Sequence, residues 1–147
     1  MLLGFIISER GIKANLVKIS AITKMGPIPN LKGVQKITGC LIALSCFISH
    51  LSDQGLPLYR ILKKTDRFAW TPEVQEALDK LKVLLTKAPI LVPPAEGESL
   101  LLYVVAMTQV VSATLVVEQG EEGHALKAQR PMYFVSEVLF DSKTRYP

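Results

Sequence analysis

Acidic, histidine and cysteine side chains build most catalytic and metal sites, and few of them stand in useful patterns here. His50 and His124 are the only histidines, and neither has a Cys, Asp or Glu at metal-ligand spacing on a clear helix face. Glu73 and Glu76 lie one helical turn apart and could form a carboxylate pair, but the dipole at a helix start also favours acids there. The residues themselves therefore predict no metal ion, no cofactor and no catalytic group.

Basic side chains are the stronger chemical signal. They stand close together in a short run and in a pair one helical turn apart, namely Lys63, Lys64, Arg67, Lys32 and Lys36. Residues 1–67 carry ten Lys and Arg against three Asp and Glu, whereas residues 68–147 carry seven against ten. Cations along a groove can neutralise nucleic-acid phosphates, so the basic half predicts a polyanionic partner. An ordinary solvated basic surface is the alternative that composition leaves open.

Two aromatic side chains flank the strongest helix start in the chain. Phe68 and Trp70 precede Thr71-Pro72-Glu73, which combines a capping hydroxyl, a proline at the first helical position and an acid in the first turn. The two rings could stack on bases. The favoured alternative is that they anchor the helix in a hydrophobic core.

Strand and helix patterns in the N-terminal half predict the elements that position these residues. Residues 2–8 are typical of a strand, and Glu9-Arg10-Gly11 of a turn in which glycine takes a positive φ. A stripe of apolar residues spaced three and four apart predicts one continuous helix over 31–51. The predicted helices, with caps at Asn15, Asn30 and Thr71, are 15–25, 31–51, 56–64 and 72–87.

The C-terminal half contains an uncharged stretch of 18 residues, Leu100–Val117. Its length admits a membrane span, but its polar residues and its many β-branched residues favour two buried strands, 99–105 and 110–118. A third strand is predicted at 131–136, and Pro93–Gly97 is typical of a linker. Helices followed by a meander predict an α+β fold without a membrane segment.

Seven short motifs occur along the chain in a fixed order. They are Leu2–Ile12, Val34–Gly39 with Phe47-Ile48, Pro57-Leu58 with Leu62–Lys64, Phe68–Thr71, Leu81-Lys82 with Ala88–Leu91, Arg130–Ser136 and Arg145–Pro147. Each motif is weak alone, but the ordered set resembles gypsy-type LTR retrotransposon polyproteins. The similar region runs from the end of the reverse transcriptase into the start of the RNase H-like domain.

The resemblance implies two parts and a fold for each. Residues 1–92 would form the C-terminal part of the reverse transcriptase, with a primer-grip hairpin and thumb/connection helices. Residues 98–147 would form a truncated RNase H-like domain with an incomplete antiparallel β-meander. Gly4 in the hairpin would join Lys32, Lys36, Lys63, Lys64 and Arg67 as a nucleic-acid-binding residue.

The same resemblance predicts that catalysis is lost. The family uses Mg²⁺ held by carboxylates, and Val105 occupies the position of the first RNase H aspartate. No acid lies between Leu100 and Val117, so a shift of register within this stretch restores no ligand. The polymerase aspartates belong to a segment upstream of Met1 in the family. No catalytic residue and no metal site are therefore predicted.

The predicted function is that of a retrotransposon-derived reverse transcriptase/RNase H-like region, inactive and binding RNA or DNA at most weakly. Its partners would be an RNA/DNA hybrid or the rest of the polyprotein, with self-association through the incomplete sheet. Two alternatives remain open. One is a protein-interaction module, and the other is a nuclease using Glu118, Glu121, Glu122, Glu137 and Asp141. The N-terminus lacks a secretory signal, and the family implies cytoplasm or nucleus.

Overall fold

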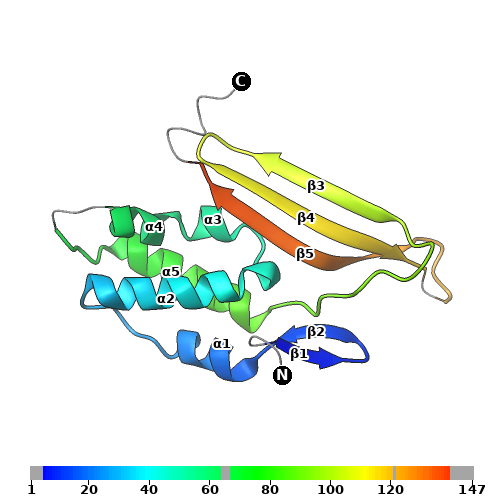
Figure 1. The fold of residues 1–147 in the computed structure, drawn as a ribbon, viewed down its shortest axis with the longest axis horizontal. Coiled ribbons are helices and arrows are strands. Elements are labelled where there is room, and N and C mark those ends of the chain that lie inside the picture. The colour runs from blue at the N-terminus through cyan, green and yellow to red at the C-terminus, as the bar shows by residue number, and fades with distance from the viewer. Residues whose placement is uncertain (1–4, 64–66, 121, 140–147) are drawn as a thin grey trace.

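The computed structural model describes residues 5–63, 67–120 and 122–139. Helices gather at one end of the molecule, a three-stranded sheet extends from the other, and the N-terminal hairpin lies alongside (Figure 1). The elements are β1 Phe5–Ser8, β2 Gly11–Ala14, α1 Leu16–Thr23, α2 Leu31–Ala43, η1 Ser45–Phe47, α3 Leu51–Gln54, α4 Leu56–Lys63, α5 Pro72–Thr86, β3 Leu100–Ala106, β4 Val110–Gln119 and β5 Ala128–Val138. The predicted α+β class, with its hairpin, helices and antiparallel sheet, is confirmed.

The hairpin turns at the glycine that the sequence singled out. Gly11 has a φ of 128°, a conformation that side-chain-bearing residues rarely adopt. A Cβ here would also collide with the carbonyl oxygen of Leu91. This close approach allows the Ile12 N–H to donate to the Leu91 oxygen at 2.8 Å and the Leu91 N–H to donate to the Ile12 oxygen at 2.9 Å. The hairpin is thereby fastened to the segment that follows α5.

All three predicted caps are present. The Asn15 side chain accepts from the Val17 N–H and the Asn30 side chain from the Gly33 N–H, both at 2.9 Å. Thr71 accepts from the Val74 N–H at 3.4 Å, with Pro72 at the first helical position. Because these caps satisfy donors that a helix leaves unpaired, they fix where α1, α2 and α5 begin.

The predicted continuous helix over 31–51 is wrong. The α-helix ends at Ala43, η1 follows, Ile48 is extended and His50 is left-handed with a φ of 55°. Phe47 and Ile48 are each only 2% exposed. Neighbouring residues on a helix point about 100° apart, and the break lets both enter the core. Phe47 then meets the Phe5 ring at a centroid distance of 5.5 Å, and η1 packs on β5.

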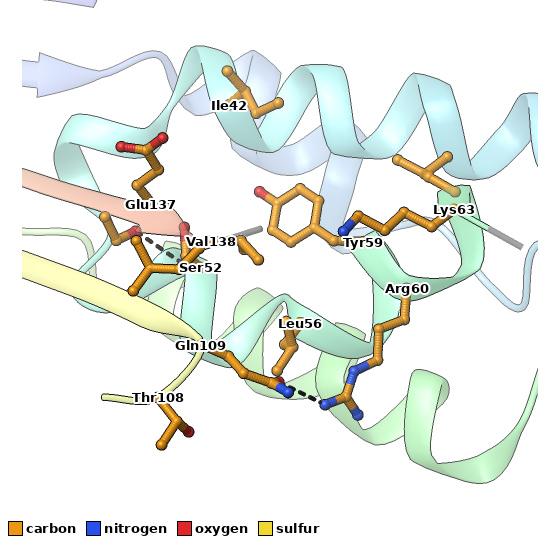
Figure 2. Close-up of a pocket in the computed structure, with 13 residues that line it drawn as sticks. Ile42, Ser52, Leu56, Tyr59, Arg60, Lys63, Thr108, Gln109, Glu137 and Val138 are labelled. Atoms are coloured by element: carbon orange, nitrogen blue, oxygen red, sulfur yellow. Dashed lines mark hydrogen bonds between the residues drawn. The ribbon is translucent and has the colours of Figure 1, made fainter. Parts of the chain in front are cut away.

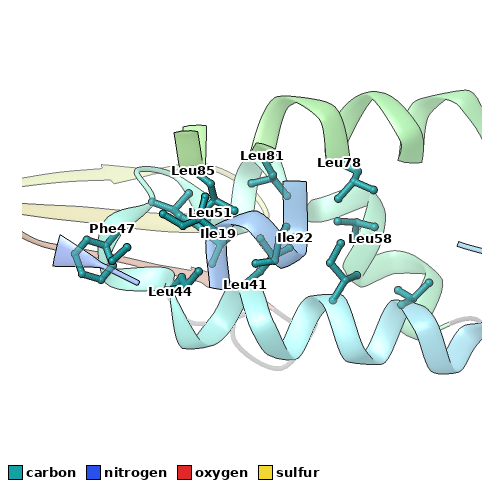
Figure 3. Packing of buried hydrophobic residues seen from close by; sticks show 14 of the residues in the cluster. Ile19, Ile22, Leu41, Leu44, Phe47, Leu51, Leu58, Leu78, Leu81 and Leu85 are labelled. Atoms are coloured by element: carbon teal, nitrogen blue, oxygen red, sulfur yellow. The ribbon is translucent and has the colours of Figure 1, made fainter. Parts of the chain in front are cut away.

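The hydrophobic core lies between α1, α2, α4 and α5 (Figure 3). The stripe predicted on the 31–51 segment supplies one wall, and α5 supplies another through Leu78, Leu81 and Leu85. Gly33 permits close packing, because a Cβ there would collide with the Ile28 side chain. Lys82 lies on α5, and its ammonium donates to the carbonyl oxygen of Met25, which follows α1.

The sheet is antiparallel in the order β3-β4-β5. The uncharged stretch 100–117 thus forms strands, as predicted, and within the described residues no helix is long and apolar enough to cross a membrane. β5 is longer than the predicted 131–136, because a register shift between Leu115 and Val116 lets pairing continue past Pro131. The Pro131 oxygen accepts from the Val92 N–H at 3.1 Å.

β3 forms an open edge of this sheet in the described part of the chain. It pairs with β4 alone, and all of its side chains except that of Leu101 are exposed, including Leu102 at 64% and Val104 at 59%. Apolar residues on an unpaired edge strand are unusual in a monomeric surface. The edge is therefore a surface where further pairing can occur.

Candidate nucleic-acid interface

A hollow opens where the helices meet the end of the sheet (Figure 2). It has a volume of about 700 Å³ and lies between α2, α3 and α4 on one side and the β3–β4 turn and the end of β5 on the other. We name it the interlayer cavity. Its lining residues are Ile42, Ser52, Leu56, Tyr59, Arg60, Leu62, Lys63, Thr108, Gln109, Ser136, Glu137, Val138 and Leu139.

Two polar contacts join the layers around the interlayer cavity. The Arg60 guanidinium donates to the Gln109 side-chain oxygen at 2.9 Å, and the Ser52 N–H donates to the Ser136 hydroxyl at 2.9 Å. Figure 2 draws both bonds between the helical side and the sheet. They hold the two walls at a fixed separation, and the first also fixes the position of a cation at the cavity.

The aromatic ring of Tyr59 stands inside the interlayer cavity, between Ile42 and Arg60 in the view of Figure 2. Burial of the phenol raises the pKa of Tyr59 above its ordinary value, because desolvation disfavours the phenolate. Tyr59 therefore presents a neutral ring and hydroxyl at physiological pH. Gly55 lies beneath it, and a Cβ there would come 3.0 Å from the Tyr59 ring.

A smaller hollow of about 190 Å³ lies between α4 and the start of α5. Arg60 and Arg67 both line it, together with Thr71 and Glu73. Arg60 therefore lines both hollows, and with Arg67 it belongs to a group of cations that we name the basic region. Lys63 adds a third cation from the last turn of α4.

The predicted nucleic-acid-binding residues fall into two groups. Lys32 and Lys36 are exposed on α2, and Lys63 and Arg67 are exposed at and after the end of α4, while Gly4 and Lys64 lie outside the described residues. The start of α2 and the end of α4 lie at the same end of the helical layer (Figure 1). Both groups thus lie at that end of the molecule.

Arg60 is the functional candidate that sequence reasoning missed. It precedes Lys63 by three residues, so the two lie on one face of α4. That helical spacing is visible in the sequence, but Arg60 stands apart from the denser basic run that begins at Lys63. Its hydrogen-bond partner, Gln109, lies 49 residues away in the chain.

The two flanking aromatics are half-buried and serve the core. Phe68 and Trp70 pack against the hydrophobic cluster, and the Trp70 indole donates to the Gln75 side-chain oxygen at 2.8 Å. The anchoring interpretation therefore fits the structure better than stacking on bases.

The acids and histidines do not converge. Glu76 pairs with Lys80 at 2.8 Å rather than with Glu73, and this hydrogen bond lowers the pKa of Glu76. Among the described residues, no group of three His, Cys, Asp or Glu is placed to hold a metal ion. Glu121 and Asp141, two members of the alternative nuclease cluster, lie outside the described residues.

Val105 lies in β3 opposite Ser112 of β4, and its side chain is partly open to solvent. Valine offers no atom that can bind Mg²⁺. The neighbouring positions on this strand pair carry no carboxylate, since the first acid of β4 is Glu118 at the far end. Val105 and its neighbours on this strand pair therefore supply no carboxylate to a metal ion.

The fold defined here is that of part of a reverse transcriptase. Three solved structures of the foamy viral protease-reverse transcriptase share it, with TM-scores of 0.75, 0.76 and 0.78 at 20% identity. They match 99–100% of this chain and 19–30% of their own length. They are complexes with dsDNA in two cases and with an RNA/DNA hybrid in the third.

Sequence similarity specifies the family. Residues 70–147 match the RNase H-like domain found in reverse transcriptase, and the chain belongs to this family. It is 31% identical over 146 residues to a retrovirus-related Pol polyprotein from transposon 297 of Drosophila melanogaster, and 30% identical over 89 residues to the transposon Tf2-3 polyprotein of Schizosaccharomyces pombe. These alignments cover 98% and 60% of this chain but only 13% and 7% of the two polyproteins.

Proposed function

We propose that this chain is a nucleic-acid-holding, catalytically inactive region of a gypsy-type retrotransposon polyprotein. The observation that carries the proposal is the basic region formed by Arg60, Lys63 and Arg67 around α4, with Lys32 and Lys36 of α2 at the same end of the layer. Such cations contact phosphates without reading sequence. The foamy viral structures with DNA and with an RNA/DNA hybrid support a ligand of this class.

The proposal assigns a separate role to each of two parts of the chain. Residues 1–92 would serve as the end of a reverse transcriptase, with the hairpin and the thumb/connection helices, and residues 98–147 as an RNase H-like part. The basic region belongs to the first part. The two hydrogen bonds across the interlayer cavity make the second part a support for it.

We propose that the chain lacks catalytic activity because of the residue at position 105, which is Val105. If Val105 stands where the family has its first RNase H aspartate, the described strand pair cannot contribute that ligand. We therefore assign no catalytic residue and no metal ligand among the described residues. A protein-only role without nucleic acid is less well supported, since it leaves the basic region unexplained.

Self-association through the edge of β3 is a further part of the proposal. The Glu118 N–H donates to the Ser99 oxygen, and the Met107 N–H donates to the Val110 oxygen. Because backbone groups alternate in direction along a strand, the residues between these bonds whose backbone faces away from β4 are Leu100, Leu102, Val104 and Ala106. These groups form an apolar open edge that a second chain could extend.

The basic region predicts how binding responds to salt and mutation. We expect a blunt RNA–DNA hybrid to bind the full chain at low salt, and we expect its affinity to fall steeply as the salt concentration rises. Lys63→Gln and Arg67→Gln should each weaken binding to hybrids of any sequence. Each should also reduce the salt slope, that is, the slope of the logarithm of the binding constant against the logarithm of salt concentration, by about one. Fluorescence anisotropy over a salt series measures both quantities.

Lys18→Gln is the matched control, because Lys18 is an exposed lysine on α1, away from the basic region. It should leave the salt slope unchanged. A hybrid that fails to bind even at low salt would refute the proposed function. Cleavage of a labelled hybrid by the purified chain with Mg²⁺ or Mn²⁺ would refute the proposed lack of catalysis.

A further inference from the structure

We infer that the interlayer cavity binds one unstacked nucleotide at a single-stranded end of the nucleic acid, with its phosphate on Arg60 and Lys63 and its base against Tyr59. This inference rests on the proposed function and specifies where a strand end would be held. It concerns a concave site formed between the two layers, whereas general duplex binding needs only the outer basic surface.

The size and lining of the cavity suit such a ligand. Small-molecule sites have volumes of about 300–1,000 Å³, and the interlayer cavity, at about 700 Å³, falls in that range. Its lining combines apolar side chains, among them Ile42, Leu56 and Val138, with polar and charged groups from both layers. A stacked base pair cannot enter a concave site, whereas an unpaired nucleotide can.

The phosphate end is set by α4. Arg60 and Lys63 lie three residues apart on one helix face and line the cavity together. The Arg60 guanidinium is held in place through its bond to Gln109. A guanidinium has five N–H donors, so this bond leaves it capable of donating to a phosphate oxygen as well.

The base would lie against the aromatic wall. Tyr59 is neutral at physiological pH, and its ring is flanked by the apolar side chains of Leu56 and Ile42 (Figure 2). Aromatic side chains bind bases of any identity through their faces. Thr108 and Ser136 carry hydroxyl groups at the cavity that can bond to base edges without strong selection.

The charge distribution gives the ligand one orientation. Glu137 lines the cavity from β5, and in Figure 2 it lies on the opposite side of Tyr59 from Arg60 and Lys63. A phosphate is repelled at the Glu137 end and attracted at the α4 end. Neutralising Glu137 should therefore strengthen binding of the nucleotide, whereas neutralising Arg60 should weaken it.

The test compares a blunt RNA–DNA hybrid with the same hybrid carrying a short single-stranded overhang, both bound to the full chain. We expect the overhang to raise affinity about tenfold, which is within the range for stacking one base on an aromatic side chain. Ile42→Trp should abolish this gain by filling the cavity, and because Ile42 is 57% exposed the change leaves the core intact. Circular dichroism confirms that each variant is folded.

Charge variants should change the overhang gain in opposite directions, which a general loss of structure would not do. Arg60→Gln should reduce the overhang gain, Glu137→Gln should increase it, and Lys18→Gln should leave it unchanged. Equal affinity for the two ligands, or a gain that survives Ile42→Trp, overturns the inference. In either case, binding of the blunt hybrid leaves the proposed function intact, whereas failure of both ligands to bind at low salt refutes both.

Discussion

Tyr59 is a residue whose ionisation is controlled by burial rather than by a charged neighbour. Desolvation raises the pKa of its phenol in the folded chain above the value of about 10 expected in the unfolded chain. The unfolded chain therefore loses this proton first as pH rises. The stability that Tyr59 contributes is fully present below about pH 10 and is lost as pH rises through the folded-state pKa.

This linkage predicts that Tyr59→Phe makes stability less sensitive to alkaline pH. The free energy of unfolding, measured by urea denaturation from about pH 8 to about pH 11, should fall less in this variant than in the native chain. Tyr133→Phe is the control, because Tyr133 is an exposed tyrosine on β5. Parallel pH curves for the native chain and Tyr59→Phe would contradict the assigned cause.

Single residues also show where sequence reasoning reaches its limit. Charge alone identifies Lys63 and Arg67 as candidate binding residues, but the sequence does not show which side chains surround the cavity. The bonds from Arg60 to Gln109 and from Ser52 to Ser136 join residues 49 and 84 positions apart. Side-chain partners at such separations depend on tertiary packing, so the interlayer cavity was not predictable before the fold was known.

Capping predicted helix starts well, whereas hydrophobic spacing misjudged one helix end. Asn15, Asn30 and Thr71 act through partners two or three residues away, so the information is local. The stripe over 31–51 continues in three-four spacing through η1 and α3, although the backbone bends after Ala43. Burial against β5 and the hairpin outweighs helical continuity there, and no local pattern encodes that competition.

The junction between the hairpin and the segment after α5 depends on Gly11. We expect Gly11→Ala to lower the free energy of unfolding by about 1–3 kcal/mol, because alanine is strained at a φ of 128°. The added methyl group would also push against the Leu91 carbonyl and weaken the bridge to Ile12. Chemical denaturation measures the loss.

Gly39→Ala supplies the comparison within a helix. Gly39 lies inside α2 with open space where a Cβ would stand, so alanine there should stabilise the chain by about 0.5–1 kcal/mol. Opposite signs for the two substitutions would support both assignments. A neutral Gly11→Ala would show that the bridge contributes little.

The whole molecule combines a covered helical core with an open sheet edge. The sequence predicted both strands of the uncharged stretch correctly, because β-branched residues and interspersed polar groups distinguish strands from a membrane helix. It could not predict the bulge beside Val116 or the extension of β5 past Pro131, since both depend on pairing across strands.

The open edge predicts association that a single charge should prevent. Val104→Lys places a cation on β3, and lysine on an edge strand opposes pairing with another chain. We expect the native chain to shift from monomer to larger species as concentration rises in analytical ultracentrifugation, and the variant to remain monomeric. A Leu126→Lys control, on an exposed residue outside the strands, should associate like the native chain.

A native chain that stays monomeric at every concentration would contradict association through β3. Association that persists unchanged in Val104→Lys would point to a different surface. Both results would leave the hybrid-binding prediction unaffected, since the basic region lies on the helical layer.

The bridge between Ile12 and Leu91 also bears on the order of events during synthesis. Within this chain the hairpin is translated before the helical layer, yet β2 obtains this partner only after the whole helical layer has been made. Translation adds about 5–20 residues per second, so β2 waits several seconds for this contact. The N-terminal hairpin should therefore be among the last parts of the described chain to acquire native hydrogen-exchange protection.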